Sequence, residues 1–364
     1  MILHFYFARR FLWYFSAILI VFAIFLALVD LVEQLRNFGN EVGFGQVVQV
    51  VALNLPEGLY TILPLVMILA SVSLFVALGR SSELVVTRAT GRSGLVALAG
   101  PVAVTAIIGG LAVAMGNPIV AATSKRAADL SELYDNGGSS VLSIGTEGLW
   151  LRQGGEQGQT VIRAARTNPD ATLLFDVSFF AYAPQGGLVR RIEAEEAHLD
   201  SGAWVLTRAK AWPLTAGLNP EANAATHEEL RVPSTLTQDS IRDRFGKPSA
   251  IPVWDMRTFI QGLEEAGFSA RRYAVWMQME LARPLFLVAM VLVAAGVTMK
   301  PARLARTGVS VLTAVLLGFG LYYVRNFAQI MGENGQLNPV LAAWIPPVAS
   351  LLLALGLVLQ MEDG

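Results

Sequence analysis

Residues that carry chemistry in other proteins are scarce in this sequence. It has no cysteine and three histidines, His4, His198 and His227, which lie far apart along the chain. A thiolate nucleophile, a disulfide framework and a thiolate metal site are therefore excluded, and three scattered histidines do not form a metal cluster. We expect ordinary surface or interface histidines, no bound metal and no catalytic residue.

Nucleotide-binding patterns are also missing. The segment Gly246-Lys247-Pro248-Ser249 imitates the end of a P-loop, but Pro248 lacks the amide that a phosphate cradle would use. The patterns G-x-S-x-G and H-E-x-x-H do not occur. A net charge of −1 gives no electrostatic footprint for nucleic acid. The sequence predicts a non-enzymatic chain that binds no cofactor of its own.

One polar segment, residues 80–94, differs from the apolar runs on either side of it. Ser81 or Ser82 can cap a helix that carries Glu83 in its first turn, beside the positive end of the helix dipole, and Gly91 can end it. The segment predicts a helix of about two turns that offers an apolar knob flanked by charges to a cytoplasmic partner. The alternative is a solvated connector. The residues expected at the contact are Ser82, Glu83, Leu84, Val85, Arg88 and Gly91.

The amino-acid composition indicates which kind of elements flank residues 80–94. Only 15% of the residues are charged, against about 25% in soluble domains, and 54% are hydrophobic. A bilayer crossing needs about 20 apolar residues, and six runs satisfy this requirement if the fourth extends backward through a Glu280–Arg283 pair. The expected spans are 11–35, 58–79, 95–120, 274–299, 307–325 and 340–360.

Residues 125–272 lie between the two groups of three spans and contain short runs in which apolar and polar residues alternate. This pattern predicts a soluble all-β insert. Phe175, Val177, Phe179 and Ala181 fall on one face of such a strand by their spacing of two. The predicted fold is therefore a polytopic α-helical membrane protein, with six spans in a 3+3 arrangement and a jelly-roll-like β domain. Its predicted domains are 1–124, 125–272 and 273–364. The expected strands are 148–152, 160–165, 173–182, 188–199 and 203–212.

Basic residues near the span ends predict the orientation in the membrane. One side holds eight of these residues and the other holds two, Arg36 and Arg325. We therefore expect both termini in the cytoplasm and the β domain outside it, in the periplasm of a Gram-negative host. The eight cytoplasmic cations are Arg9, Arg10, Arg80, Arg88, Arg92, Lys300, Arg303 and Arg306.

The segment 82–91 resembles the coupling-helix motif of the LptF/LptG permeases of the lipopolysaccharide export ABC transporter. Three further pieces fall in the same order as in that family: residues 30–36 at the end of span one, Gly148-Leu149-Trp150 at the start of the insert, and Arg272-Tyr273 before Pro284. The resemblance covers the whole chain. Gly-Leu-Trp and the Val-Glu-Gln-Leu-Arg ending favour the LptG branch over LptF.

The resemblance implies a mechanism and a set of partners. Two homologous permeases, LptF-like and LptG-like, would enclose a cavity in the bacterial inner membrane above a cytoplasmic LptB-like ATPase dimer, which alone binds ATP and Mg. ATP-driven closure would act on the coupling helix, with Glu83 as the charge partner of a basic ATPase residue. Lipopolysaccharide would leave the inner membrane for an LptC-like single-span protein and an LptA-like bridge.

The same resemblance implies sites for substrate and for a lateral gate. Arg36, Lys125 and Arg126 are candidates to line the rim of the substrate cavity, with interfacial anchoring as the alternative. Asp30 does not suit an anion-binding rim and could pair with a cation of the partner permease. Gate candidates on span five are Phe319, Tyr322 and Tyr323, with packing inside the bundle as the alternative.

Two other functions fit the same layout. One is a six-span membrane scaffold or receptor with a periplasmic β sensor domain. The other is an ABC permease for another amphiphile, such as lipoproteins. Co-purification separates the first from a transporter, because a transporter half should bring down an ATPase and a second permease.

Overall fold

A computed structural model provides the structure, and two compact units divide the chain between them. The helical unit consists of Met1–Ser131, Ser249–Met256 and Arg271–Gly364, and the β unit of Glu132–Pro248 and Arg257–Ala270. The structure describes residues 2–38, 42–81, 83–89, 93–136, 143–145, 148–155, 158–167, 173–183, 187–200, 202–214, 219–234, 247–265, 269–299 and 307–363.

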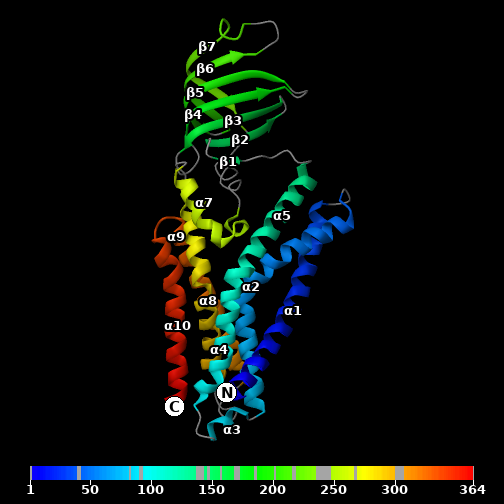
Figure 1. The fold of residues 1–364 in the computed structure, drawn as a ribbon, viewed down its shortest axis with the longest axis vertical. Helices are drawn as coiled ribbons and strands as arrows, with labels where there is room; N and C mark the ends of the chain where they lie inside the picture. Colours follow the sequence, from blue (N-terminus) through cyan, green and yellow to red (C-terminus); the bar gives the residue numbers. More distant parts are fainter. Residues whose placement is uncertain are drawn as a thin grey trace. The chain divides into compact units, whose positions relative to one another are not determined.

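Six helices in the described part of the chain are long and apolar enough to cross a membrane, as predicted. The start of α1, the short helix α3 and the end of α10 lie at the same end of the helical unit (Figure 1). The helices are α1 (Ile2–Phe38), α2 (Phe44–Arg80), α3 (Glu83–Ala89), α4 (Gly94–Leu111), the π-helix η1 (Ala112–Gly116), α5 (Asn117–Asn136), the 3₁₀ turn η2 (Pro248–Ala250), α7 (Val253–Glu265), α8 (Arg271–Thr298), α9 (Thr307–Glu333) and α10 (Pro339–Asp363).

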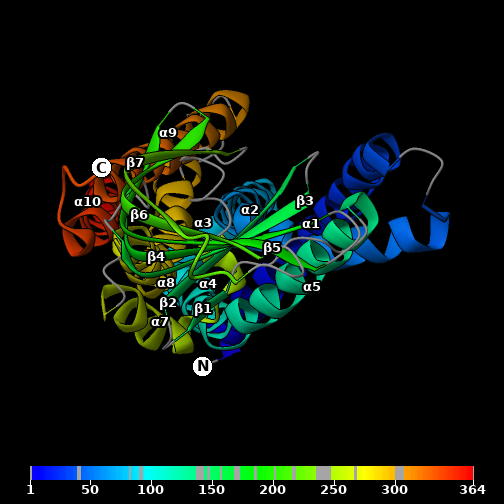
Figure 2. The same ribbon diagram turned by 90° about the horizontal axis from the view of Figure 1, so that it is seen from above.

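Burial differs sharply between these helices. α8 is buried over most of its length, whereas α1 buries mainly the stripe Phe7, Phe11 and Phe15 near its start. These three residues are spaced by four and therefore share one helical face. The far end of α1 and the beginning of α2 lean away from the other helices (Figures 1 and 2). α1 is thus anchored at one end and largely exposed at the other.

Two helices extend beyond the expected spans. α2 begins at Phe44 rather than near residue 58, and α4, η1 and α5 run on continuously to Asn136. Pro56 lies inside α2, which shows that the helix continues past a residue that usually interrupts one. Lys125 and Arg126 consequently lie on α5 and not in a loop after span three.

The β unit contains one antiparallel sheet in which every described strand pairs with its sequence neighbours, in the order β1 to β7. All five expected strands are present, and two further strands, β1 and β7, were not predicted. The strand order is that of a meander, which is simpler than the expected jelly roll. The strands are β1 (Ser143–Gly145), β2 (Gly148–Gly155), β3 (Gly158–Thr167), β4 (Leu173–Tyr182), β5 (Leu188–Asp200), β6 (Ala203–Pro213) and β7 (Ala225–Pro233).

Two details of the predicted insert were wrong. Val177 and Phe179 are buried as expected, but the third core residue of β4 is Leu174 and not Phe175. Asp176, between them, has a φ of 53°, and the alternation of buried and exposed residues shifts by one at this position, although the pairing register with β3 and β5 continues through it. The insert is also not purely β, because α7 follows the sheet. The sequence of α7 has helical periodicity, but it contains charged residues and is too short to cross a bilayer.

A buried polar group joins α2, α5 and α8. Arg283 donates to Glu280, 3.2 Å from Nε to Oε2, and Tyr60 and Asn117 also donate to this carboxylate. Pro64 has no amide, so the carbonyl of Tyr60 loses its helical donor, and Arg283 Nη1 replaces that donor at 3.0 Å. The Glu280–Arg283 pairing predicted from the sequence is confirmed, and Glu280 is fully buried.

This pair generates a stability prediction. We expect Glu280→Ala to destabilise the protein by about 3–5 kcal/mol, because it leaves the buried Arg283 charge without a counter-ion. Thermal unfolding in detergent measures the change, with Glu264→Ala, at an exposed position of α7, as the control. The double variant Glu280→Met/Arg283→Met should recover part of the loss, because it removes the unpaired charge but leaves the Tyr60 carbonyl without its replacement donor. A double variant as unstable as Glu280→Ala would contradict this explanation.

Candidate functional site

The short helix α3 connects α2 to α4 at the end of the helical unit where α1 begins (Figure 1). Glu83 occupies its first turn, where a negative charge is favourable. The Thr87 hydroxyl donates to the Glu83 carbonyl at 2.8 Å, which gives the single described hydrogen bond from a side chain to the backbone of α3 itself. The predicted short helix is confirmed over seven residues.

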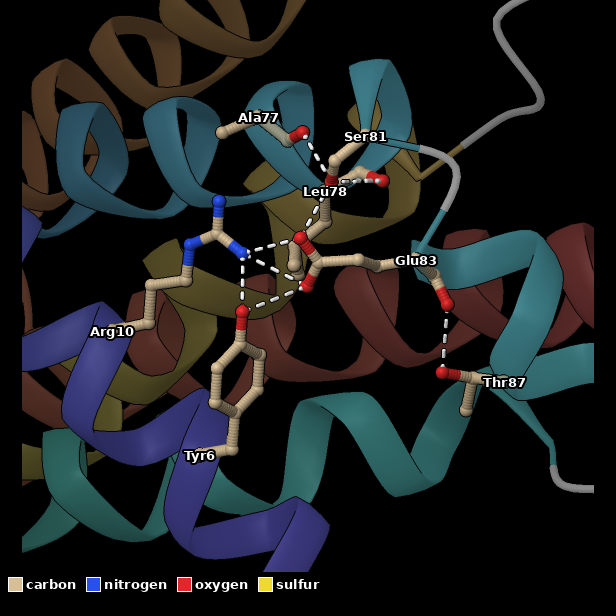
Figure 3. Close-up of polar contacts among 7 residues, drawn as sticks. All are labelled: Tyr6, Arg10, Ala77, Leu78, Ser81, Glu83 and Thr87. Carbon is tan, nitrogen blue, oxygen red and sulfur yellow. Dashed lines mark hydrogen bonds and ion pairs between the residues drawn. The ribbon is translucent and has the colours of Figure 1, made fainter.

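Three side chains outside α3 hold the Glu83 carboxylate (Figure 3). Arg10 Nη1, from α1, lies 2.7 Å from Oε1 and 2.8 Å from Oε2. The Tyr6 hydroxyl, one turn earlier on α1, donates to Oε2 at 3.0 Å and accepts from Arg10 at 2.7 Å. The Ser81 hydroxyl, at the end of α2, lies 2.7 Å from Oε1. One carboxylate therefore connects α3 to both α1 and α2.

These contacts change the acidity of Glu83. Partial burial alone would raise the pKa of its carboxyl, but the hydrogen bonds from Arg10, Ser81 and Tyr6 and the charge of Arg10 lower the pKa below its usual value. The side chains of Arg10 and Glu83 are 26% and 32% exposed, so water weakens the pair without breaking it. We expect a coupling free energy of about 1 kcal/mol.

The same contacts occupy much of the carboxylate. Each oxygen can accept about two hydrogen bonds, and each oxygen of Glu83 lies within reach of two donor atoms of its own chain, of which Arg10 Nη1 is shared by both oxygens. An external basic residue would therefore compete with these donors for Glu83. The structure thus assigns Glu83 an internal partner that the sequence did not predict. The sequence had indicated Arg10 only as one of the basic residues that predict the orientation in the membrane. No sequence signal predicts that residues 10 and 83 lie together.

The faces of α3 also differ from the prediction. Leu84, expected as an outward apolar knob, is 6% exposed and belongs to the main hydrophobic core. Thr87 is buried as well, whereas Val86 is 63% exposed and Ala89 is exposed one turn later. Two of the predicted contact residues, Ser82 and Gly91, lie outside the described residues. Val85 and Arg88 lie on α3, and only their backbone is described.

The start of α1 is held a second time, by α4. A Cβ added at Gly100 would lie 2.4 Å from the carbonyl oxygen of His4 and 3.0 Å from the amide of Ala8. Only glycine permits this approach of two helix backbones. Together with the Arg10–Glu83 pair, this contact fixes the first three turns of α1 against α3 and α4.

The remaining predicted site residues lie elsewhere in the helical unit. Arg36 is exposed near the end of α1, and Lys125 and Arg126 are exposed on α5. Asp30 accepts hydrogen bonds within its own chain, from Gln34 at 3.1 Å and Asn54 at 3.2 Å.

The three gate candidates lie on α9. Tyr323 is 67% exposed and Phe319 is 41% exposed. Phe319 and the partly buried Tyr322 line a cavity between α2, α8 and α9.

Six long apolar helices, a β unit inserted between the third and fourth, and a short helix at one end of the helical unit are the features of a multi-pass membrane protein. The family model for lipopolysaccharide export system permeases LptF/LptG matches residues 5–360. The chain belongs to this family, whose permease subunits are non-catalytic.

Characterised relatives agree with the family assignment. The chain is similar to the lipopolysaccharide export system permease protein LptG of Haemophilus influenzae, with 24% identity over 90% of this chain and 88% of the relative. It is 25% identical to LptG of Escherichia coli K12 over 92% of this chain and 91% of the relative. LptG of Escherichia coli O6:H1 gives the same identity and coverage. These likenesses support the LptG branch expected from the sequence.

The depressed pKa of Glu83 predicts how α3 responds to acid. The stabilising contribution of the carboxylate is present above the usual glutamate pKa and is lost as the pH falls through the lowered pKa of the folded protein. The chain has no cysteine, so a spin label at Val86→Cys reports on α3 alone. We expect constant label mobility from pH 7 to 5 and increased mobility below about pH 4.

Glu83→Gln provides the matched control in the same labelled chain, because it removes the charge and keeps the shape. We expect high label mobility in this variant across the whole pH range. Equal label mobility at pH 7 in the Glu83→Gln variant and in the chain that retains Glu83 would show that the carboxylate does not hold α3.

Proposed function

We propose that this chain is the LptG-like permease subunit of an ABC transporter that extracts lipopolysaccharide from the inner membrane. A separate cytoplasmic ATPase dimer, which binds ATP and Mg, would supply the force. An LptF-like permease would complete the transmembrane pathway, and the β unit would pass the lipid to LptC-like and LptA-like periplasmic proteins. Family membership supports this function over a sensor scaffold.

The observation that carries the proposal is the attachment of α3 to α1 through Glu83. A force on α3 reaches α2 through Ser81, the core through Leu84 and α1 through Arg10 and Tyr6. α1 is clamped to α3 and α4 at this end and exposes large apolar side chains beyond it, among them Ile24, Phe25 and Leu28. Movement of α3 would therefore displace a long helix whose far part is largely exposed and remains attached to α2, for example through Asp30 and Asn54.

The ATPase would dock on the 82–91 segment through the exposed side of α3. Among the described side chains of α3, Val86 is the large apolar one at the surface, and Ala89 follows on the same side at a spacing of three. The contact proposed from the sequence thus moves from Leu84, which is buried, to Val86. Glu83 would act mainly inside the chain, by transmitting the movement.

The distribution of basic residues in the sequence supports the proposed orientation. Eight of them flank the predicted span ends on the side expected to be cytoplasmic and two flank the other ends, which favours cytoplasmic termini and a periplasmic β unit. With that orientation, Arg36, Lys125 and Arg126 would lie near the periplasmic interface and could bind the phosphates of lipopolysaccharide. Phe319, Tyr322 and Tyr323 on α9 would border the opening through which lipid enters.

Separate variants distinguish docking from transmission. Val86→Asp should abolish co-purification of the ATPase, since it puts a charge into an apolar contact. Arg10→Gln and Glu83→Gln should leave the ATPase bound and still hydrolysing ATP, and should lower lipopolysaccharide extraction about tenfold in reconstituted vesicles. Val189→Asp, an exposed valine of the β unit, is the matched control and should retain the ATPase.

Two results would contradict the proposal. If Val86→Asp retained a fully coupled ATPase, α3 would not be the docking element. If Glu83→Gln released the ATPase while Arg10→Gln did not, Glu83 would contact the ATPase directly, as the sequence first predicted. It would then not act by linking α3 to α1 within the chain.

A further inference from the structure

The buried polar group of the helical unit contains one more cation than it can neutralise. Arg325 on α9 is 7% exposed, and its guanidinium carbon lies 5.2 Å from the centre of the Phe286 ring on α8. Its Nε is buried without a hydrogen-bond partner among the described residues. The nearby carboxylate, Glu280, already accepts from Arg283, Tyr60 and Asn117. A buried, unpaired guanidinium is costly and indicates a missing anion.

An apolar cavity lies about one helical turn from this cation, since Tyr322 on α9 and Met290 on α8 line it and Arg325 packs on Phe286. It has a volume of about 120 Å³ between α2, α8 and α9, and its lining is apolar apart from Thr61 and Tyr322. Tyr322 precedes Arg325 by three residues on the same helical face. A cavity of about 150 Å³ with an aliphatic lining accommodates a benzene molecule. The space near Arg325 is therefore suited to part of one acyl chain.

The depth of the two features matches a lipid. Arg325 follows Thr307, the start of α9, by 18 residues, or about 27 Å of helix, which is close to the thickness of the hydrocarbon layer. The cavity residues Gly318 and Phe319 lie one to two turns deeper than Arg325. Gly318 allows this packing, because a Cβ there would lie 1.9 Å from Ile68 Cδ1. Counted from Thr307, the cation would lie near the far boundary of the hydrocarbon layer, and the cavity would lie within the layer.

We propose that Arg325 and this cavity bind one anionic glycerophospholipid, with the phosphate on the guanidinium and one acyl chain between α2, α8 and α9. One unpaired cation and space for one chain fit a lipid with a single phosphodiester and a net charge of −1. They do not fit lipopolysaccharide, whose several phosphates and acyl chains need a wider cavity. The cavity shares Phe319 and Tyr322 with the opening proposed for lipid entry, so this site borders that opening and differs from it in the lipid that it holds.

Native mass spectrometry of the full-length protein tests the site with phosphatidylglycerol as the probe. We expect Arg325→Gln to weaken binding about tenfold or more, because a charge-assisted hydrogen bond is lost. Thr61→Phe, at an exposed position beside the cavity, should weaken it by filling the chain site. Arg272→Gln removes an exposed arginine from α8 and should leave binding unchanged. Zwitterionic phosphatidylethanolamine should bind more weakly than phosphatidylglycerol.

Thermal unfolding without added lipid separates a binding role from a structural one. An unpaired buried cation destabilises the empty protein, so Arg325→Leu should raise the unfolding temperature while it abolishes lipid binding. A lowered unfolding temperature would assign Arg325 a structural role and overturn the proposal. Unchanged phosphatidylglycerol binding in Arg325→Gln would also overturn it, as would lipid A binding with the same dependence on Arg325.

Discussion

A single carboxylate ties the short helix α3 to the rest of the membrane unit. Glu83 accepts hydrogen bonds from Arg10 and Tyr6 on α1 and from Ser81 at the end of α2. Without the pair, α3 would keep its core contact through Leu84 but would lose its link to α1. The proposed transmission from an ATPase to the far end of α1 therefore depends on this interaction.

The helical unit combines rigid and adjustable parts in a way that suits such transmission. α8 is buried almost throughout and carries the Glu280–Arg283 pair, which satisfies a carbonyl that Pro64 leaves without its helical donor. α1 has the opposite character, since it is clamped at its start by Gly100 and Glu83 and exposed beyond Phe15. A movement applied at α3 would therefore displace α1 against a fixed α8.

The parts of this structure that depend on local pattern could be predicted from the sequence. Apolar length predicted six membrane helices, period-two alternation predicted five of the strands, and capping residues predicted α3. Prediction failed where distant contacts decide the outcome. Leu84 is buried because the core reaches α3, and Glu83 is paired because α1 passes beside it. The positive φ of Asp176 accompanies the inward position of Leu174 in place of Phe175. None of these contacts leaves a signal in the local sequence.

The exchange of the two charges tests the central claim most directly. In a reconstituted transporter, Arg10→Glu and Glu83→Arg alone should each lower lipopolysaccharide extraction strongly, because like charges then face each other. The double variant Arg10→Glu/Glu83→Arg restores the attraction within the chain, and the account predicts extraction close to that of the unmodified protein. A double variant as inactive as the single ones would show that Glu83 acts on a partner outside the chain, and would contradict the account.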